Sequence, residues 1–459
     1  MDLILEADKA IVDISLLLSV LAGITVLLVL ILGFKIQSFI SLLIASITVG
    51  ILAGMEPLAI IETIKKGMGD TLGFVALVIG LGAIFGSILE YSGGAEALAR
   101  FLLKKFGEKR ASWALMITGF LIAIPVFFDV AFIILVPIIY SLQRRTKKSL
   151  LLYAIPLLAG LAITHSFIPP TPGPIAVADI LGADLGWVIV FGLLVGIPTA
   201  IVCGPIFAKY ISEKLHVEAP PVSSETTKEE QYPAIGLILS IIGIPILLIV
   251  CNTIINSPFV GEEIISKDVK AWIGLIGNPI VALILANLIA WYLLGIRRKV
   301  SKKKLLDITS NSMGPTGIII LLTGAGGVFK EILVTTKTGE MLAKYFAEIG
   351  IPIIIFGFFI AVLVRILQGS ATVAMITAAG FTSPLLMGQE SITDIDKALL
   401  VIAIASGASI MSHVNDSGFW LVSKYLGINE KQTFQSWTVM TTILALVSFA
   451  IVTLITFLT

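Results

Sequence analysis

The chain has 459 residues, of which 57% are apolar and 13% are charged, and its mean hydropathy is +1.04. Soluble domains carry about 25% charged residues, so this composition excludes a soluble globular protein and predicts an all-α integral membrane protein. The 31 basic and 30 acidic residues nearly balance, which argues against nucleic acid as a partner.

Apolar runs long enough to cross a bilayer recur along the chain. At roughly twenty apolar residues per crossing, full spans are predicted near residues 14–34, 36–54, 73–90, 150–181, 186–209, 233–252, 272–295, 317–334, 397–425 and 434–457. Two other segments do not fit a simple crossing. Residues 111–140 are interrupted by Pro125 and Asp129, and residues 351–387 are interrupted by Arg365, Gln368, Gly369 and Ser370. Both are predicted to be re-entrant hairpins, because each has room for two half-helices with a polar tip between them.

A proline-rich stretch interrupts the predicted span at 150–181. Residues 164–174 read THSFIPPTPGP, and four prolines within six residues cannot continue a helix. Unpaired backbone groups are costly in hydrocarbon, so they persist only where protein or a water-filled cavity receives them. The sequence SHVNDSG at 412–418 predicts a second broken helix, in the span at 397–425. Broken helices at such depth are where many transporters hold a polar solute.

Clusters of lysine and arginine predict the orientation of the chain. They lie at residues 100–110, 143–148 and 297–304. If residues 111–140 enter and leave on one side, all of these clusters lie on the same face, which is then cytoplasmic. The longest polar loop, at 212–232, is expected on that face too, and the amino terminus on the other.

The chain also repeats itself at an offset of about 245 residues. The stretch that begins at Met68 resembles the one that begins at Met313, with Phe85 aligned to Phe329. The predicted hairpins and breaks recur at the same offset, and the two copies begin on opposite faces. They predict inverted-topology repeats, whose solute site lies where the repeats meet. The predicted organisation is N-terminal spans at 1–54, a first repeat at 55–211, the loop at 212–232, linking spans at 233–299 and a second repeat at 300–459.

Polar tips from both repeats are expected to converge on one solute site. Half-helix N-termini there present free N–H groups and a partial positive charge, which suit a carboxylate. Small residues let the backbone approach a ligand, and hydroxyl groups suit a polyhydroxylated solute. The predicted substrate-binding residues are His165, Ser166, Thr171, Gly173, Gly369, Ser370, Thr372, Asn415 and Ser417.

Ionisable groups inside a membrane span are functional candidates by default. Those nearest the inferred centre, and therefore the candidates for proton coupling, are Asp129, His165, His413 and Asp416. Histidine titrates near physiological pH and burial favours a neutral aspartate, so either type can carry a proton. These groups also have purely structural alternatives. Asp129 can be the hydrogen-bond partner of a backbone N–H at the hairpin tip, and each histidine can be a packing residue. Arg365 is expected to pair with an aspartate or with the carboxylate of the substrate.

In these segments the sequence resembles the gluconate permease (GntP) family of the ion transporter superfamily. THSFIPPTPGPIAVA from Thr164, QGSATVAMITAAG from Gln368 and SHVNDSGFW from Ser412 are similar to its signature segments, and FFDVAFIILVP around Asp129 resembles its first hairpin. The resemblance covers essentially the whole chain. It implies proton-coupled uptake of gluconate or a related small hydroxy acid across the inner membrane of a bacterium. It also implies a scaffold domain that forms a homodimer and a transport domain that carries the hairpins and moves as an elevator.

The substrate, the coupling ion and the function class each have alternatives. Glycerate and D-serine are alternative carboxylates, and Na⁺ is the alternative coupling ion. No metal or other cofactor is predicted, and membrane lipid is expected around the spans. An intramembrane metal-dependent enzyme with His165, His413 and Asp416 as ligands is a rival, but the chain lacks an HExxH pair and its third histidine, His216, falls in the polar loop. A passive channel is a second rival, which the inverted repeats and broken helices argue against.

Overall fold

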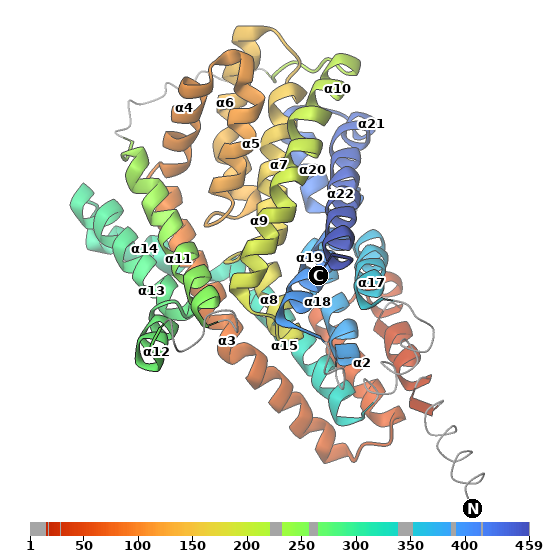
Figure 1. Cartoon of the computed structure of the whole chain (residues 1–459). Coiled ribbons are helices and arrows are strands. Elements are labelled where there is room, and N and C mark those ends of the chain that lie inside the picture. The colour runs from red at the N-terminus through yellow and green to blue at the C-terminus, as the bar shows by residue number, and fades with distance from the viewer. Residues whose placement is uncertain are drawn as a thin grey trace, which may run out of the picture.

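The computed structural model describes residues 15–16, 18–27, 29–220, 232–256, 265–337, 352–386, 392–414 and 416–458. Every regular element within these ranges is a helix, as Figure 1 shows. Seven of the helices in the described ranges are long and apolar enough to cross a membrane. The prediction of an all-α membrane protein with several spans is therefore confirmed.

The helices follow one another in four groups along the described chain. The first comprises η1 (Val29–Gly33), α2 (Ser38–Leu52), α3 (Pro57–Tyr91), α4 (Gly94–Phe106) and η2 (Glu108–Arg110). The second comprises α5 (Ala111–Ile122), α6 (Phe128–Thr146), α7 (Leu151–Phe167), α8 (Pro172–Leu181), α9 (Leu185–Ile201), η3 (Val202–Ile206) and α10 (Phe207–Lys214). The third comprises α11 (Ile235–Asn256), α12 (Lys267–Ile276), α13 (Pro279–Ala290), η4 (Trp291–Gly295), η5 (Ile296–Arg298) and α14 (Lys302–Asn311). The fourth comprises α15 (Met313–Thr335), α17 (Ile353–Gln368), α18 (Ala371–Thr382), η6 (Ser383–Leu386), α19 (Asp394–Ala408), α20 (Ser417–Leu426), α21 (Glu430–Thr433), η7 (Phe434–Thr438) and α22 (Val439–Thr456).

The chain leaves the helix where prolines and glycines predict that it should. The four residues 168–171 separate α7 from α8, and Pro172 starts α8 at a position where a missing N–H costs no hydrogen bond. Residues 409–416 separate α19 from α20. Gly369 and Ser370 separate α17 from α18, and the φ of +92° at Gly369 is one that glycine adopts without steric cost.

Two predicted spans have wrong boundaries, and a third corresponds to a short helix. The span predicted at 73–90 is the second half of α3, which begins at Pro57 because residues 57–72 carry nothing that breaks a helix. The span predicted at 272–295 is divided, since α12 ends before Gly277 and Pro279 begins α13. The span predicted at 36–54 is α2, whose ends lie within two residues of the predicted ones, but its 15 residues are fewer than a hydrocarbon thickness of about 30 Å requires.

Helices α3 and α15 form an antiparallel pair, with α3 running diagonally across the lower half of Figure 1. A Cβ on Gly67 would stand 2.8 Å from the carbonyl oxygen of Gly327, whereas Gly80 of the same helix faces Met313 at the opposite end of α15. Because Gly67 has no side chain, the two backbones approach closely. Lys66 and Glu331 form an ion pair of 2.7 Å between the same helices.

Two further helix pairs pack in the same way as each other. Helix α5 packs against α7, and α17 packs against α19. A Cβ on Gly160 would overlap the backbone of α5 at Met116, and a Cβ on Gly407 would overlap the backbone of α17 at Phe358. In both pairs, therefore, a glycine on the second helix lets the first lie directly against it.

The turn between α5 and α6 packs directly against helix α3. A Cβ on Gly86 would overlap the carbonyl oxygen of Pro125, a backbone atom that cannot rotate away. We expect Gly86→Ala to destabilise the protein by about 1–3 kcal/mol, as overpacking does, and to lower the temperature of thermal unfolding in detergent. Gly73→Ala on the same helix is the control, because no atom lies within 4 Å of its Cβ position. Equal unfolding temperatures for the two variants would contradict this close approach.

Candidate functional site

A cavity of about 570 Å³ lies where the α5–α6 turn, the α17–α18 turn and the α19–α20 break meet. The start of α6, the C-terminal end of α7, the α17–α18 turn, the α19–α20 break and the helices α15, η7 and α22 all contribute to it. Its lining is Phe127, Phe128, Asp129, Val130, Ala162, His165, Ser166, Ile319, Arg365, Gln368, Gly369, Ser370, Ala371, Thr372, Ser409, Asp416, Ser417, Gly418, Trp437, Thr441 and Leu444. The hydroxyl of Ser409 donates to that of Ser166 at 3.0 Å, so the end of α7 directly contacts the start of the α19–α20 break.

The first turns of several helices lie at this cavity. Helices α6, α18 and α20 all begin in its lining. The Ser370 hydroxyl accepts a hydrogen bond from the N–H of Val373 at 3.3 Å, and the Asp416 carboxylate accepts one from the N–H of Gly418 at 3.1 Å. No described side chain caps α6. Because first-turn N–H groups lack intrahelical partners and carry the positive end of the helix dipole, the cavity suits an anion.

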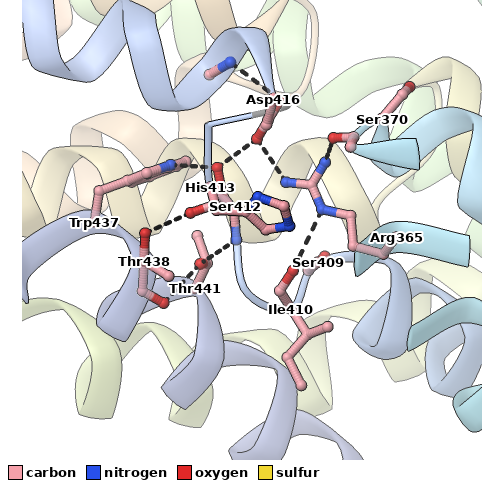
Figure 2. A network of polar contacts seen from close by, with 12 residues as sticks. Arg365, Ser370, Ser409, Ile410, Ser412, His413, Asp416, Trp437, Thr438 and Thr441 are labelled. Carbon is pink, nitrogen blue, oxygen red and sulfur yellow. Dashed lines mark hydrogen bonds and ion pairs between the residues drawn. The ribbon is translucent and has the colours of Figure 1, made fainter. Parts of the chain in front are cut away.

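A buried ion pair joins the last turn of α17 to the α19–α20 break. An Nη2 of Arg365 lies 2.6 Å from Oδ2 of Asp416, and the two side chains are 4% and 13% exposed. The rest of the guanidinium donates to backbone carbonyls, from Nε to Ile410 at 3.3 Å and from Nη1 to Gly369. Figure 2 shows the guanidinium lying between these acceptors. Such bonding is needed to hold a buried charge, because an unpaired one is strongly destabilising.

The C-terminal helices hold the α19–α20 break through Ser412. The hydroxyl of Ser412 donates to Oδ2 of Asp416 and accepts from Nε1 of Trp437 at 2.6 Å. The carbonyl of Ser412 accepts from the Thr438 hydroxyl, and its N–H donates to the Thr441 hydroxyl at 3.1 Å (Figure 2). Both the N–H and the carbonyl of Ser412 therefore have hydrogen-bond partners, and these hydrogen bonds fix the break to η7 and α22.

The structure brings most of the predicted site residues to the cavity and leaves some away from it. Those that line it are Asp129, His165, Ser166, Gly369, Ser370, Thr372, Asp416 and Ser417. Thr171 instead lies against α3 and donates to the carbonyl of Ile168 at 2.6 Å. A Cβ on Gly173 would stand 2.6 Å from Sδ of Met375, so this glycine packs on α18. Asn415 lies outside the described residues.

His413 does not line the cavity either. Its Nε2 lies 3.0 Å from the carbonyl oxygen of Ile366 in α17. Because a carbonyl only accepts, this geometry requires the proton on Nε2. The ring therefore ties the α19–α20 break to α17, beside the Arg365 pair.

The family profile of the GntP permeases matches residues 15–458. The chain belongs to the GntP permease family. It is 38% identical over 447 residues to the gluconate permease of Pseudomonas aeruginosa, covering 96% of this chain and 98% of that one. It is 39% identical over 444 residues to the low-affinity gluconate transporter of Escherichia coli K12, with the same coverage. The Gnt-II system L-idonate transporter of E. coli K12 is 35% identical over 437 residues, covering 94% and 96% of the two chains.

Solved structures share the fold of this GntP permease. MtrF of Neisseria gonorrhoeae, from a class of antimetabolite efflux pumps, matches with a TM-score of 0.60 and 16% identity, covering 85% of this chain and 82% of that one. The YdaH transporter of Alcanivorax borkumensis matches with a TM-score of 0.59 and 13% identity, covering 85% and 86%. The predicted family is confirmed, and the chain is a multi-pass membrane permease and not an enzyme.

Two ionisable side chains face the cavity of the permease without a partner. Within the described residues, nothing donates a hydrogen bond to the Asp129 carboxylate, which is exposed to the cavity. The Nδ1 atom of His165 is buried and has no hydrogen-bond partner among the described residues. The His165 ring lies 6.5 Å from that of Phe128, centroid to centroid. A buried polar atom without a partner is costly, so a ligand that bonds to His165 gains by removing that cost.

Some cavity residues of the permease went unrecognised in the sequence. Ser409 directly follows the end of α19, so a broader definition of the second break includes it. Trp437 and Thr441 lie in an apolar span and carry no local signal. Thr441 reaches the cavity because α22 packs against α19, and Trp437 lies on η7, which directly precedes α22. These are tertiary contacts.

Proposed function

We propose that this permease takes up gluconate or a related small hydroxy acid together with a proton, across the inner membrane of a bacterium. The observation that carries the proposal is the cavity where the N-termini of α6, α18 and α20 meet beside the Arg365 guanidinium. The gluconate permease of P. aeruginosa and the gluconate and L-idonate transporters of E. coli support the substrate class, because all of these sugar acids carry one carboxylate and several hydroxyls.

The substrate is proposed to bind with its carboxylate at the N-termini of α18 and α20. Backbone N–H groups near Ser370 and Thr372 then face the anion. Hydroxyl groups of Ser166 and Ser417 and the ring of His165 face the polyhydroxylated end of the solute. A cavity of about 570 Å³ falls within the range of 300–1,000 Å³ common for small-molecule sites. Asn415, which precedes Asp416, is proposed to contribute to the same site.

Proton coupling is proposed to draw on Asp129, His165, His413 and Asp416. Asp129, His165 and Asp416 line the cavity, so they are placed to exchange protons with the solution that enters with the substrate. His413 bonds to α17 and is proposed to act by holding the α19–α20 break. A proton is favoured over Na⁺ because these groups change their charge by titration.

The proposed architecture is an inverted repeat with re-entrant hairpins at 111–140 and 351–387. The order α5, α6, α7, α8, α9 is followed later in the chain by α17, α18, α19, α20 and α22. The glycine contact of α5 with α7 has its counterpart between α17 and α19, and the equivalent helices α3 and α15 cross antiparallel. These features support repeats of opposite orientation. We propose that the hairpins and broken helices form a transport domain, which moves as an elevator against a scaffold that forms a homodimer.

Uptake into proteoliposomes tests this function. We expect an acidic exterior to drive accumulation of labelled gluconate, by up to about tenfold per pH unit for a one-to-one symport, because one pH unit corresponds to about 1.36 kcal/mol. The same assay is run with L-idonate, glycerate and D-serine, and with a Na⁺ gradient in place of the pH gradient. Uptake that never exceeds the electrochemical equilibrium of the solute identifies a channel. A protein that transports none of these acids contradicts the proposal.

A further inference from the structure

The guanidinium of Arg365 lines the cavity, but its donors already bind other groups of the protein. Its bond to Asp416 is 2.6 Å, and its other described bonds go to the backbone carbonyls of Ile410 and Gly369. A guanidinium binds carboxylates with a planar, charge-assisted geometry. Asp416 and a sugar acid carry the same functional group, so both compete for the same donor.

The described hydrogen bonds of Asp416 are those that an ionised carboxylate accepts. Its carboxylate accepts hydrogen bonds from the Arg365 guanidinium, the Ser412 hydroxyl and the N–H of Gly418. All of these groups donate, and an ionised carboxylate only accepts. Protonation removes the charge that attracts Arg365 and places a competing O–H among these donors. Asp416 also lines the cavity, so a proton can reach it from the cavity.

We propose that Asp416 holds the place of the substrate carboxylate on Arg365, and that protonation of Asp416 transfers Arg365 to the substrate. The proposal rests on the proposed function and assigns its coupling step. A proton adds to Asp416 and neutralises it, the Arg365–Asp416 ion pair breaks, and Arg365 pairs with the carboxylate of the incoming acid. One carboxylate replaces another, so the empty and the loaded sites carry the same net charge.

The other ionisable groups around Asp416 agree with this role. Asp129 at the start of α6 interacts electrostatically with Asp416, so two negative charges repel there and a third would be unfavourable. A substrate anion is therefore better accommodated once a proton has entered. His165 on α7 also faces the cavity, and His413 is held by α17. In the described lining, α18 and α22 add no ionisable side chain.

Asp129 and His165 are less suited to this transfer. No described cation is paired with Asp129, so its protonation frees no donor for the substrate. His165 gains a positive charge on protonation and has no carboxylate in a hydrogen bond with it among the described residues. Asp416 differs from both because its protonation releases a buried guanidinium.

Binding of gluconate to the purified full-length permease, measured by calorimetry between pH 5.5 and 8.0, tests the transfer. For the wild type we expect the Kd to rise with pH, by up to about tenfold per unit, because one linked proton gives this slope. For Asp416→Asn we expect the Kd to change less than about twofold over the range, because an amide does not titrate. In proteoliposomes this variant is expected to exchange labelled for unlabelled gluconate but not to accumulate it on a pH gradient. Asp268→Asn, an exposed carboxylate on α12, is the control and is expected to keep the wild-type slope.

The outcomes separate the transfer from the function itself. If the wild type neither binds nor transports sugar acids, the proposed function is wrong. If the wild type is proton-coupled and Asp416→Asn keeps its pH slope or its accumulation, only the transfer is wrong. If Asp416→Asn does not fold, the variant Ser412→Ala tests the transfer in its place. It removes a donor to the ionised carboxylate without touching Arg365, so we expect the pH of half-maximal binding to rise by about half a unit or more. An unchanged pH of half-maximal binding in Ser412→Ala overturns the proposal.

Discussion

Substitution of Arg365 by glutamine is expected to abolish gluconate uptake and to weaken gluconate binding by about 100-fold or more, because truncating one partner of a buried charge pair costs several kcal/mol. Within the described cavity lining, Arg365 is the cation available to a carboxylate. The same substitution leaves Asp416 without its ion-pair partner, which is expected to destabilise the protein by about 3–5 kcal/mol. Thermal unfolding in detergent, with and without gluconate, measures both effects.

A double variant separates the two roles of Arg365. Asp416→Asn together with Arg365→Gln removes both charges, so we expect most of the stability to return while binding stays lost. Arg365→Lys keeps the charge without the planar fork, and we expect it to retain part of the affinity. A double variant that binds gluconate as tightly as the wild type would show that Arg365 does not contact the substrate.

Substitution of Asp129 by asparagine is expected to lower proton-driven uptake of gluconate about tenfold near neutral pH, while exchange of labelled for unlabelled gluconate persists. Asp129 and Asp416 repel each other, and this repulsion favours uptake of a proton by the pair. Without the Asp129 charge, this repulsion is lost. The pH of half-maximal uptake should therefore fall by about one unit, which corresponds to about tenfold at neutral pH.

Initial rates of uptake between pH 5 and 8 in proteoliposomes measure this shift. The effect should be opposite in sign to that of Ser412→Ala, because one variant removes a repulsive charge and the other removes a stabilising hydrogen bond. Asp268→Asn on α12 again serves as the exposed control. An Asp129→Asn variant with the wild-type pH profile would show that Asp129 takes no part in coupling.

The positions of the helix breaks followed from local chemistry in the sequence. Proline at 169, 170, 172 and 174 removes N–H groups and restricts the preceding residues, so the interruption between α7 and α8 needs no tertiary information. The same local reasoning failed at α12 and α13, where Gly277 and Pro279 were read as part of one span. It failed there because an apolar run by itself does not reveal a cap.

The sequence by itself determined the class of the protein, its family, the interruptions of its helices and most of the polar residues at them. Only the tertiary structure decided which of those residues share a cavity. Thr171 lies against α3 and Gly173 packs on α18, so neither lines the cavity. Arg365 and Asp416, which are 51 positions apart, form an ion pair at the wall of the cavity. The physical reason is that composition and proline act through neighbouring residues, whereas an ion pair depends on how separate helices pack, and no local pattern encodes that.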